Sequence, residues 1–230
     1  MNTLPPAAVL FDMDGTLIDS EKLWDVALRE LAVHYGGQLS AEARLAMVGS
    51  DMATTMGLLH EDLGQPWRDP ATGAAWLTRR VTALFSAGVP ARPGAFELVR
   101  AVRTAGLRTA LVTSTERALV DVALHTIGRH NFDVVCCGDE VPATKPDPAP
   151  YLAAAAALGV SAVDCVAVED SPAGVASAHA AGAAVLAVPA EAVFPVPDRV
   201  QVRASLCDVT VADLTALLAA YRADLPLAAG

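Results

Sequence analysis

Two carboxylates separated by a single residue follow the first apolar run of the chain. Asp12 and Asp14 come directly after residues 7–11 and just before the turn residues Gly15-Thr16. Neighbouring carboxylates repel each other unless a cation lies between them or one of them keeps a proton. An apolar strand gains no stability from such an ending, so the pair indicates a divalent metal site, acid–base chemistry, or both. A simple Asp-Gly hairpin turn is the alternative that involves no chemistry.

Hydroxyl groups and a lysine mark two later positions. The apolar run 108–113 ends in Thr113-Ser114-Thr115, where a hydroxyl and a backbone N–H would either hold a phosphate oxygen or cap the helix that follows. Lys145 begins the segment Lys-Pro-Asp-Pro and is one of two lysines in the chain. A lone lysine is ordinarily a solvated surface charge. An ammonium at this position would instead balance Asp12 and a phosphoryl group in transfer.

A second pair of acids, Glu169 and Asp170, ends the apolar run 163–168. Negative side chains just before a helix stabilise its N-terminus. Carboxylate oxygens are also the hard ligands that Mg²⁺ takes in proteins. The residues alone permit both interpretations.

The elements that must position these side chains alternate along the chain. Strand-like apolar runs lie at residues 7–11, 108–113, 133–137, 165–168 and 184–188, with helical patterns at 96–105, 117–127, 149–158, 173–181 and 211–221. This alternation predicts a parallel sheet covered on both faces. Helix starts at Thr115, Asp147-Pro148 and Ser171-Pro172 would direct unpaired N–H groups toward the same sheet edge as Asp12, which favours anion binding there.

The interval from residue 19 to residue 91 breaks the alternation. It contains helical patterns near 21–35, 41–47, 52–63 and 74–87, punctuated by Gly and Pro. We therefore predict a core formed by residues 1–18 and 92–230 and a small all-α domain formed by residues 19–91. The basic residues of the insert are expected on its surface; they are His34, Arg44, His60, Arg68, Arg79 and Arg80.

Composition limits the functional class. The chain has 230 residues, 53% of them hydrophobic, and a formal net charge of −10, which argues against a nucleic-acid partner. It has no run of about 20 apolar residues that would cross a membrane, and its first residues lack the basic-then-apolar pattern of a signal peptide. The four cysteines show no zinc-site spacing. These features favour a cytoplasmic protein.

The four motifs, in this order, resemble those of the haloacid dehalogenase superfamily, whose members are mostly phosphatases that use an aspartate nucleophile. The resemblance covers nearly the whole chain, with the helical insert as the family's cap domain. It implies an α/β, Rossmann-like, doubly wound parallel sheet with strand order 5-4-1-2-3. That order places the ends of the first and fourth strands side by side, at the switch point where open sheets bind ligands.

The resemblance also implies roles for the residues. Asp12 would be the nucleophile that forms an aspartyl-phosphate, and Asp14 would protonate the leaving oxygen and then activate water. The implied magnesium ligands are Asp12, the backbone carbonyl of Asp14, Asp170 and Glu169, the last directly or through water. The implied phosphate-binding groups are Thr113, Lys145 and the backbone N–H groups of Met13, Asp14 and Ser114. The expected function is a Mg²⁺-dependent phosphatase, a monomer acting on a small phosphorylated metabolite such as a sugar phosphate.

Two alternative functions are compatible with this architecture. A β-phosphoglucomutase-like enzyme would pass the phosphoryl group to a sugar hydroxyl; such mutases tend to carry a basic residue soon after a cap glycine, and the segment Val48-Gly49-Ser50-Asp51-Met52 carries none. A protein that binds phosphate or a partner without turnover would be expected to lack a catalytic residue, and none is missing. A dehalogenase would lack the acid at position 14.

Overall fold

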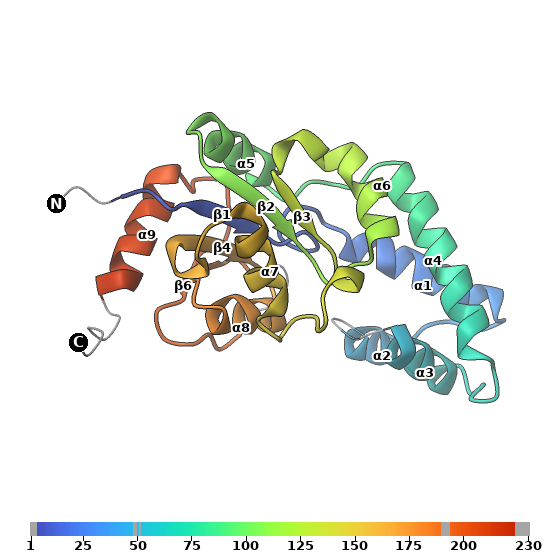
Figure 1. Cartoon of the computed structure of the whole chain (residues 1–230). Coiled ribbons are helices and arrows are strands. Elements are labelled where there is room, and N and C mark those ends of the chain that lie inside the picture. Colours follow the sequence, from blue (N-terminus) through green and yellow to red (C-terminus); the bar gives the residue numbers. More distant parts are fainter. Residues whose placement is uncertain (1–3, 48–49, 51, 190–193, 224–230) are drawn as a thin grey trace. The chain divides into compact units, whose positions relative to one another are not determined.

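The computed structural model describes residues 4–47, 50, 52–189 and 194–223. The chain divides into two compact units, one formed by Met1–Asp19 with Pro90–Gly230 and the other by Ser20–Val89. Figure 1 labels the elements of both.

The first unit is built on a parallel sheet. Its strands are β1 (Ala8–Phe11), β2 (Arg108–Val112), β3 (Val134–Cys136), β4 (Cys165–Glu169), β5 (Ala184–Ala187) and β6 (Gln201–Val202), in the order β3-β2-β1-β4-β5-β6. The α/β Rossmann-like class is confirmed, and the five expected strands lie in the expected order. The prediction of five strands was one short, because β6 has only two residues, too few to give an apolar pattern, and follows a Pro-rich stretch.

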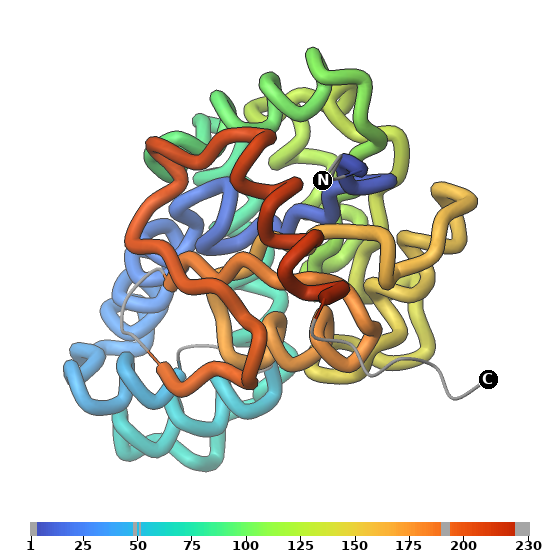
Figure 2. Tube along the Cα trace, turned by 90° about the vertical axis from the view of Figure 1, so that its left-hand side faces the viewer, coloured from blue at the N-terminus to red at the C-terminus, as the bar shows by residue number. Residues whose placement is uncertain are grey.

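Helices cover both faces of this sheet. On one face α7 (Ala149–Leu158) and α8 (Pro172–Ala180) form a buried cluster with alternate residues of β1, β2, β4 and β5. On the other, α5 (Ala95–Thr104) contacts β2, and α9 (Val211–Ala223) contacts β4, β5 and α5 (Figures 1 and 2). The helix α6 (Arg117–Ile127) follows β2. Alternate residues face opposite ways along a strand, so both faces of a buried sheet must be apolar, and β1 is fully buried.

The second unit is all-helical in the part that the structure describes. It contains α1 (Glu21–His34), α2 (Ala41–Ala46), α3 (Met52–Asp62) and α4 (Pro70–Ser86). Asp69 caps α4 by accepting from the backbone N–H groups of Ala71 and Thr72. The Arg44 guanidinium pairs with the carboxylates of Glu21 (2.9 Å) and Asp25 (3.0 Å), which ties α2 to α1.

One basic residue of the second unit, His60, is buried rather than exposed as predicted. The side chain is 3% exposed and lies against the Tyr35 ring, with 5.8 Å between ring centroids, and its Nε2 has no hydrogen-bond partner. The helical pattern of α3 turns this position toward α4, so the imidazole is buried with Met56 and Leu59. Burial, followed by the positive charge of Arg68, lowers the pKa of His60 below its usual 6.5, and Asp69 opposes the effect.

This burial predicts a loss of stability in acid. The unfolded chain takes up a proton on His60 near the usual pKa of about 6.5, whereas the folded protein resists it. Stability from this group is therefore full above that pH and falls as the pH decreases through it. The His60→Gln variant should lose less unfolding free energy than the wild type between about pH 7.5 and about pH 5 in urea titrations. Identical losses in the two proteins would refute this account of His60.

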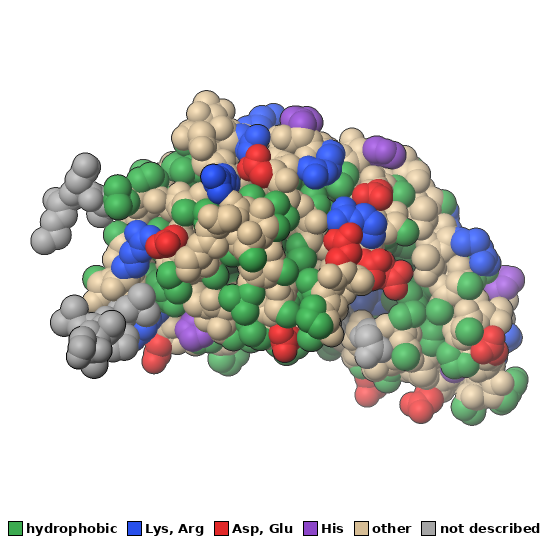
Figure 3. All heavy atoms as spheres, in the orientation of Figure 1, with side chains coloured by type: hydrophobic (Ala, Val, Ile, Leu, Met, Phe, Trp, Pro, Cys, Tyr) green, Lys and Arg blue, Asp and Glu red, His purple; other side chains and the backbone are tan. Residues whose placement is uncertain are grey.

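Charged side chains of both signs lie scattered among hydrophobic and other residues on the face drawn in Figure 3. On the first unit, for example, the guanidinium of Arg117 pairs with the Glu140 carboxylate at 2.7 Å. Among the described residues, no helix combines the length and the apolar character needed to span a bilayer.

Candidate active site

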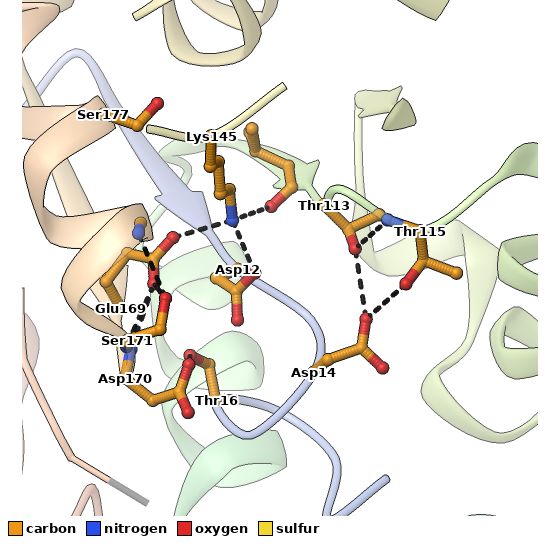
Figure 4. Close-up of polar contacts among 12 residues, drawn as sticks. Asp12, Asp14, Thr16, Thr113, Thr115, Lys145, Glu169, Asp170, Ser171 and Ser177 are labelled. Atoms are coloured by element: carbon orange, nitrogen blue, oxygen red, sulfur yellow. Dashed lines mark hydrogen bonds and ion pairs between the residues drawn. The ribbon is translucent and has the colours of Figure 1, made fainter. Parts of the chain in front are cut away.

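The register of the sheet brings the motif residues to one edge. Phe11 of β1 pairs with Leu111 of β2 and with Val168 of β4, so the residues that follow these positions emerge together. The Asp12 N–H donates to the Val168 carbonyl at 3.0 Å. A shift of one residue in any strand would turn these side chains to the other face. The strand ends therefore place Asp12, Thr113 and Glu169 beside one another (Figure 4).

Lys145 is held by three acceptors at this edge. Its Nζ donates to Asp12 Oδ1 at 2.6 Å, to Glu169 Oε1 at 2.7 Å and to the Val112 carbonyl at 2.9 Å. These contacts use all three N–H donors of an ammonium. Burial alone would disfavour the charge, but the carboxylates of Asp12 and Glu169 raise the pKa of Lys145 above its usual value. The side chain is 6% exposed, so Lys145 is a buried, permanently charged partner of the two acids.

Glu169 is bound on both carboxylate oxygens. Oε1 also accepts from the buried hydroxyl of Tyr151 at 2.7 Å. Oε2 accepts from the Asp170 N–H at 3.1 Å and from the Ser171 hydroxyl at 3.3 Å. The carboxylate lies directly against Gly174 of α8, where an added Cβ would come within 1.9 Å of it. Only a glycine fits at that position while Glu169 keeps this place.

Asp170 is positioned by the turn that follows β1. Thr16 Oγ1 donates to Asp170 Oδ1 at 3.3 Å. Gly15 has a φ of +79°, and a Cβ there would lie 2.1 Å from Asp170 Oδ2. The Asp-Gly pair of the sequence therefore makes a turn that also leaves room for the second acidic motif.

Three carboxylates could hold a metal ion. Oxygens of Asp12, Glu169 and Asp170 lie within 4.8 Å of one another. Asp12 Oδ2 is buried without a hydrogen-bond partner. Burial, and repulsion from neighbouring carboxylates, raise the pKa of Asp12 to about 7 against the pull of Lys145, and that of Asp170 to about 9. The single ammonium of Lys145 does not balance three carboxylates, and a cation bound to their hard oxygens would supply the missing positive charge. The residues present therefore fit a metal ion.

Asp14 belongs to a separate hydrogen-bond group. Its Oδ2 accepts from Thr113 Oγ1 at 3.1 Å and from Thr115 Oγ1 at 2.8 Å, whereas its Oδ1 is buried without a partner. The prediction that Thr115 caps α6 was wrong, because Glu116 is the N-cap residue and the Thr115 hydroxyl is directed to Asp14 instead. Met13 and Ser114, predicted to offer backbone N–H groups, adjoin Asp12 and Thr113 on the same two strand ends.

The helix starts agree in part with the predicted caps. Ser171 is the N-cap of α8, and its hydroxyl accepts from the Gly174 N–H at 3.0 Å, as expected. At α7 the N-cap residue is Pro148, one position later than predicted, although Asp147 Oδ1 accepts from the Ala149 N–H at 2.8 Å. Tyr151 had no predicted role in the site, and the Thr115 hydroxyl was predicted to cap a helix rather than to bind Asp14. Their contacts depend on the packing of α7 and on the rotamer after β2, which no spacing in the sequence encodes.

Comparison with known proteins agrees with this arrangement. The family model described as haloacid dehalogenase-like hydrolase matches residues 6–182. Hexitol phosphatase B of Escherichia coli (strain K12) is 33% identical over 221 residues, covering 92% of this chain and 94% of that protein. Fructose-1-phosphate phosphatase YqaB of the same organism is 36% identical over 179 residues, covering 76% and 93%.

A solved structure extends the comparison to three dimensions. CbbY from Rhodobacter sphaeroides, solved in complex with phosphate, matches with a TM-score of 0.76 and 27% identity, covering 91% of this chain and 99% of that one. Because the family model matches well over half of the sequence and the sheet carries all four motifs on one edge, the chain belongs to the haloacid dehalogenase-like hydrolases.

Proposed function

We propose that the protein is a Mg²⁺-dependent phosphatase that hydrolyses a small phosphorylated metabolite, a sugar or sugar-alcohol phosphate, through an aspartyl-phosphate on Asp12. One observation carries the proposal. Asp12 has one oxygen fixed by Lys145 and the other buried without a hydrogen-bond partner, next to two further carboxylates. A carboxylate held in this way is oriented for attack by its second oxygen. The relatives named as hexitol and fructose-1-phosphate phosphatases support the substrate class.

Asp12 and Lys145 would perform the first step. Asp12 Oδ2 forms the new bond to phosphorus while the ester P–O bond breaks. Lys145 keeps Oδ1 in place and offsets the charge that accumulates on the phosphoryl oxygens. Thr113 and the backbone N–H groups of Met13 and Ser114 would bind those oxygens, which carry the spread charge of the transition state.

Asp14 would act first as the general acid and then as the general base. Its Oδ1 gives a proton to the leaving alkoxide oxygen as the ester bond breaks, so that a neutral alcohol departs. The resulting carboxylate then takes a proton from the water that attacks phosphorus, which breaks the bond to Asp12 and releases inorganic phosphate. The unpartnered Oδ1, held beside the hydroxyl-bound Oδ2, suits this exchange.

Mg²⁺ is the metal we propose for the acidic cluster. Asp12, Asp170 and the Asp14 backbone carbonyl would hold it, with Glu169 as a ligand either directly or through water. Bound there, the ion supplies positive charge that allows an anionic carboxylate to approach an anionic phosphate.

Transfer to a sugar hydroxyl, as in a β-phosphoglucomutase, is the second candidate. It would use the same core residues, and only the acceptor differs. The segment Val48-Gly49-Ser50-Asp51-Met52 lacks a basic residue, which favours hydrolysis. Val48, Gly49 and Asp51 lie outside the described residues.

A substrate panel with metal control tests the proposal. We expect phosphate release from hexitol phosphates, fructose 1-phosphate and p-nitrophenyl phosphate, loss of that release in EDTA, and recovery when Mg²⁺ is added. Incubation with β-glucose 1-phosphate, followed by assay for glucose 6-phosphate, separates the two candidates. Isomerised sugar phosphate with little free phosphate would favour the mutase. Turnover that EDTA does not change would contradict the metal site.

A further inference from the structure

Two threonine hydroxyls converge on a single oxygen of Asp14. Thr115 Oγ1 lies 2.8 Å and Thr113 Oγ1 lies 3.1 Å from Asp14 Oδ2, as the dashed lines of Figure 4 show. The partner oxygen, Oδ1, is buried and accepts no hydrogen bond from the described residues. The two oxygens of the carboxylate therefore differ: Oδ2 accepts from two hydroxyls, and Oδ1 accepts no hydrogen bond from the described residues.

The two hydroxyls are not equivalent. A threonine hydroxyl has one proton to donate. In this structure Thr113 Oγ1 accepts from the Thr115 N–H at 3.0 Å and donates its one hydrogen bond to Asp14. In the phosphatase reaction proposed above, on which this inference rests, Thr113 donates that proton to a phosphoryl oxygen. It then has none left for Asp14, so Thr115 is the described side-chain donor that remains on Oδ2.

The backbone around Thr115 is fixed independently of the substrate. The Thr115 carbonyl accepts from the Gly138 N–H at 3.0 Å, a contact that does not involve Thr113. Gly138 itself lies against Ser114, the residue before Thr115, since a Cβ at Gly138 would come within 2.1 Å of the Ser114 carbonyl oxygen. The Thr115 hydroxyl can thus keep its place while the Thr113 hydroxyl changes partner.

We propose that Thr115 is a positioning residue that holds Asp14 Oδ2 when Thr113 turns to the phosphate, so that Oδ1 faces the leaving oxygen. Thr115 contacts Asp14 and takes no part in binding the phosphoryl group. Its loss should therefore impair proton delivery to the leaving group and spare phosphate binding. For a substrate whose leaving group needs no proton, kcat/KM should change little when the Thr115 hydroxyl is removed.

Leaving-group dependence provides the test. The Thr115→Val variant keeps the shape of the side chain and removes the hydroxyl, and Thr115→Ser keeps the hydroxyl. We expect kcat/KM of Thr115→Val to fall on the order of 10-fold or more for an alkyl phosphate such as a hexitol phosphate, within the range that a general acid contributes. For p-nitrophenyl phosphate the fall should be less than about 2-fold. Inhibition by inorganic phosphate should be unchanged, and Thr115→Ser should restore most of the alkyl phosphate activity.

Controls separate the possible failures. Thr215→Val on α9 removes a hydroxyl that donates to the Val211 carbonyl and should change the turnover of neither substrate. Thr113→Val should weaken inhibition by inorganic phosphate. Equal losses on both substrates in Thr115→Val, no loss on either, or weakened phosphate inhibition would each overturn the positioning role. A folded wild type that turns over neither substrate with Mg²⁺ would overturn the proposed function, and with it this inference.

Discussion

Replacement of Asp12 by Asn should abolish phosphate release and leave the fold intact. The amide cannot attack phosphorus, so kcat should fall by at least about 10⁴-fold, as expected when a nucleophile is removed. The same change removes one of several buried negative charges; burial, with repulsion from the neighbouring carboxylates, raises the pKa of Asp12 to about 7. The variant should therefore be as stable as the wild type when no metal is bound, or more stable. Steady-state assays and thermal unfolding in EDTA measure the two effects.

The Asp198→Asn variant is the matched control for Asp12→Asn. Asp198 is an exposed residue of the same unit, and its conversion to Asn should change neither kcat nor unfolding. Retention of more than a small fraction of activity in freshly purified Asp12→Asn would show that another residue is the nucleophile.

Replacement of Lys145 by Met should affect both activity and stability. The ammonium links Asp12 and Glu169 at 2.6 and 2.7 Å, and all three side chains are buried. Removing one partner of a buried ion pair leaves an uncompensated charge and costs about 3–5 kcal/mol. We expect an unfolding free energy lower by that amount in EDTA, and a kcat reduced on the order of 10²–10³-fold, because a preorganised charge near the transferring group is lost.

The other lysine provides the comparison for Lys145→Met. Lys22 is an exposed residue of α1, in the second unit. Lys22→Met therefore changes the net charge by the same amount and leaves the ammonium between Asp12 and Glu169 in place. Its unfolding free energy and kcat should match those of the wild type. Near-normal stability of Lys145→Met would mean that Asp12 and Glu169 do not depend on Lys145.

Much of the core could be predicted because its pattern is unambiguous. Mostly buried strands rich in Ala, Val and Leu alternate with helices, and α6 and α7 begin and end at the predicted residues. The sixth strand was missed because its two residues pair with β5 through the backbone, and backbone pairing has no side-chain signature. The burial of His60 was missed because a lone basic residue gives no sign of which helix face will be covered.

The residues of the candidate site could be found from the ends of apolar runs, and the parallel register explains why they meet. Acids and hydroxyls that terminate neighbouring parallel strands converge without further instruction. Tyr151 could not be found in this way. Tyr151 reaches Glu169 from a helix on one face of the sheet. The roles assigned to all these residues remain predictions until their variants are assayed.

Chemical trapping of the phosphorylated enzyme tests the central claim most directly. The Asp14→Asn variant, incubated with Mg²⁺ and p-nitrophenyl phosphate, should accumulate the phosphorylated intermediate. The p-nitrophenolate leaving group needs no proton, so the intermediate forms, and the water that would hydrolyse it lacks a base. Borohydride reduces an acyl phosphate to an alcohol, so peptide mass spectrometry should find Asp12 converted to homoserine. Reduction at another carboxylate, or none despite a burst of p-nitrophenol, would contradict Asp12 as the nucleophile.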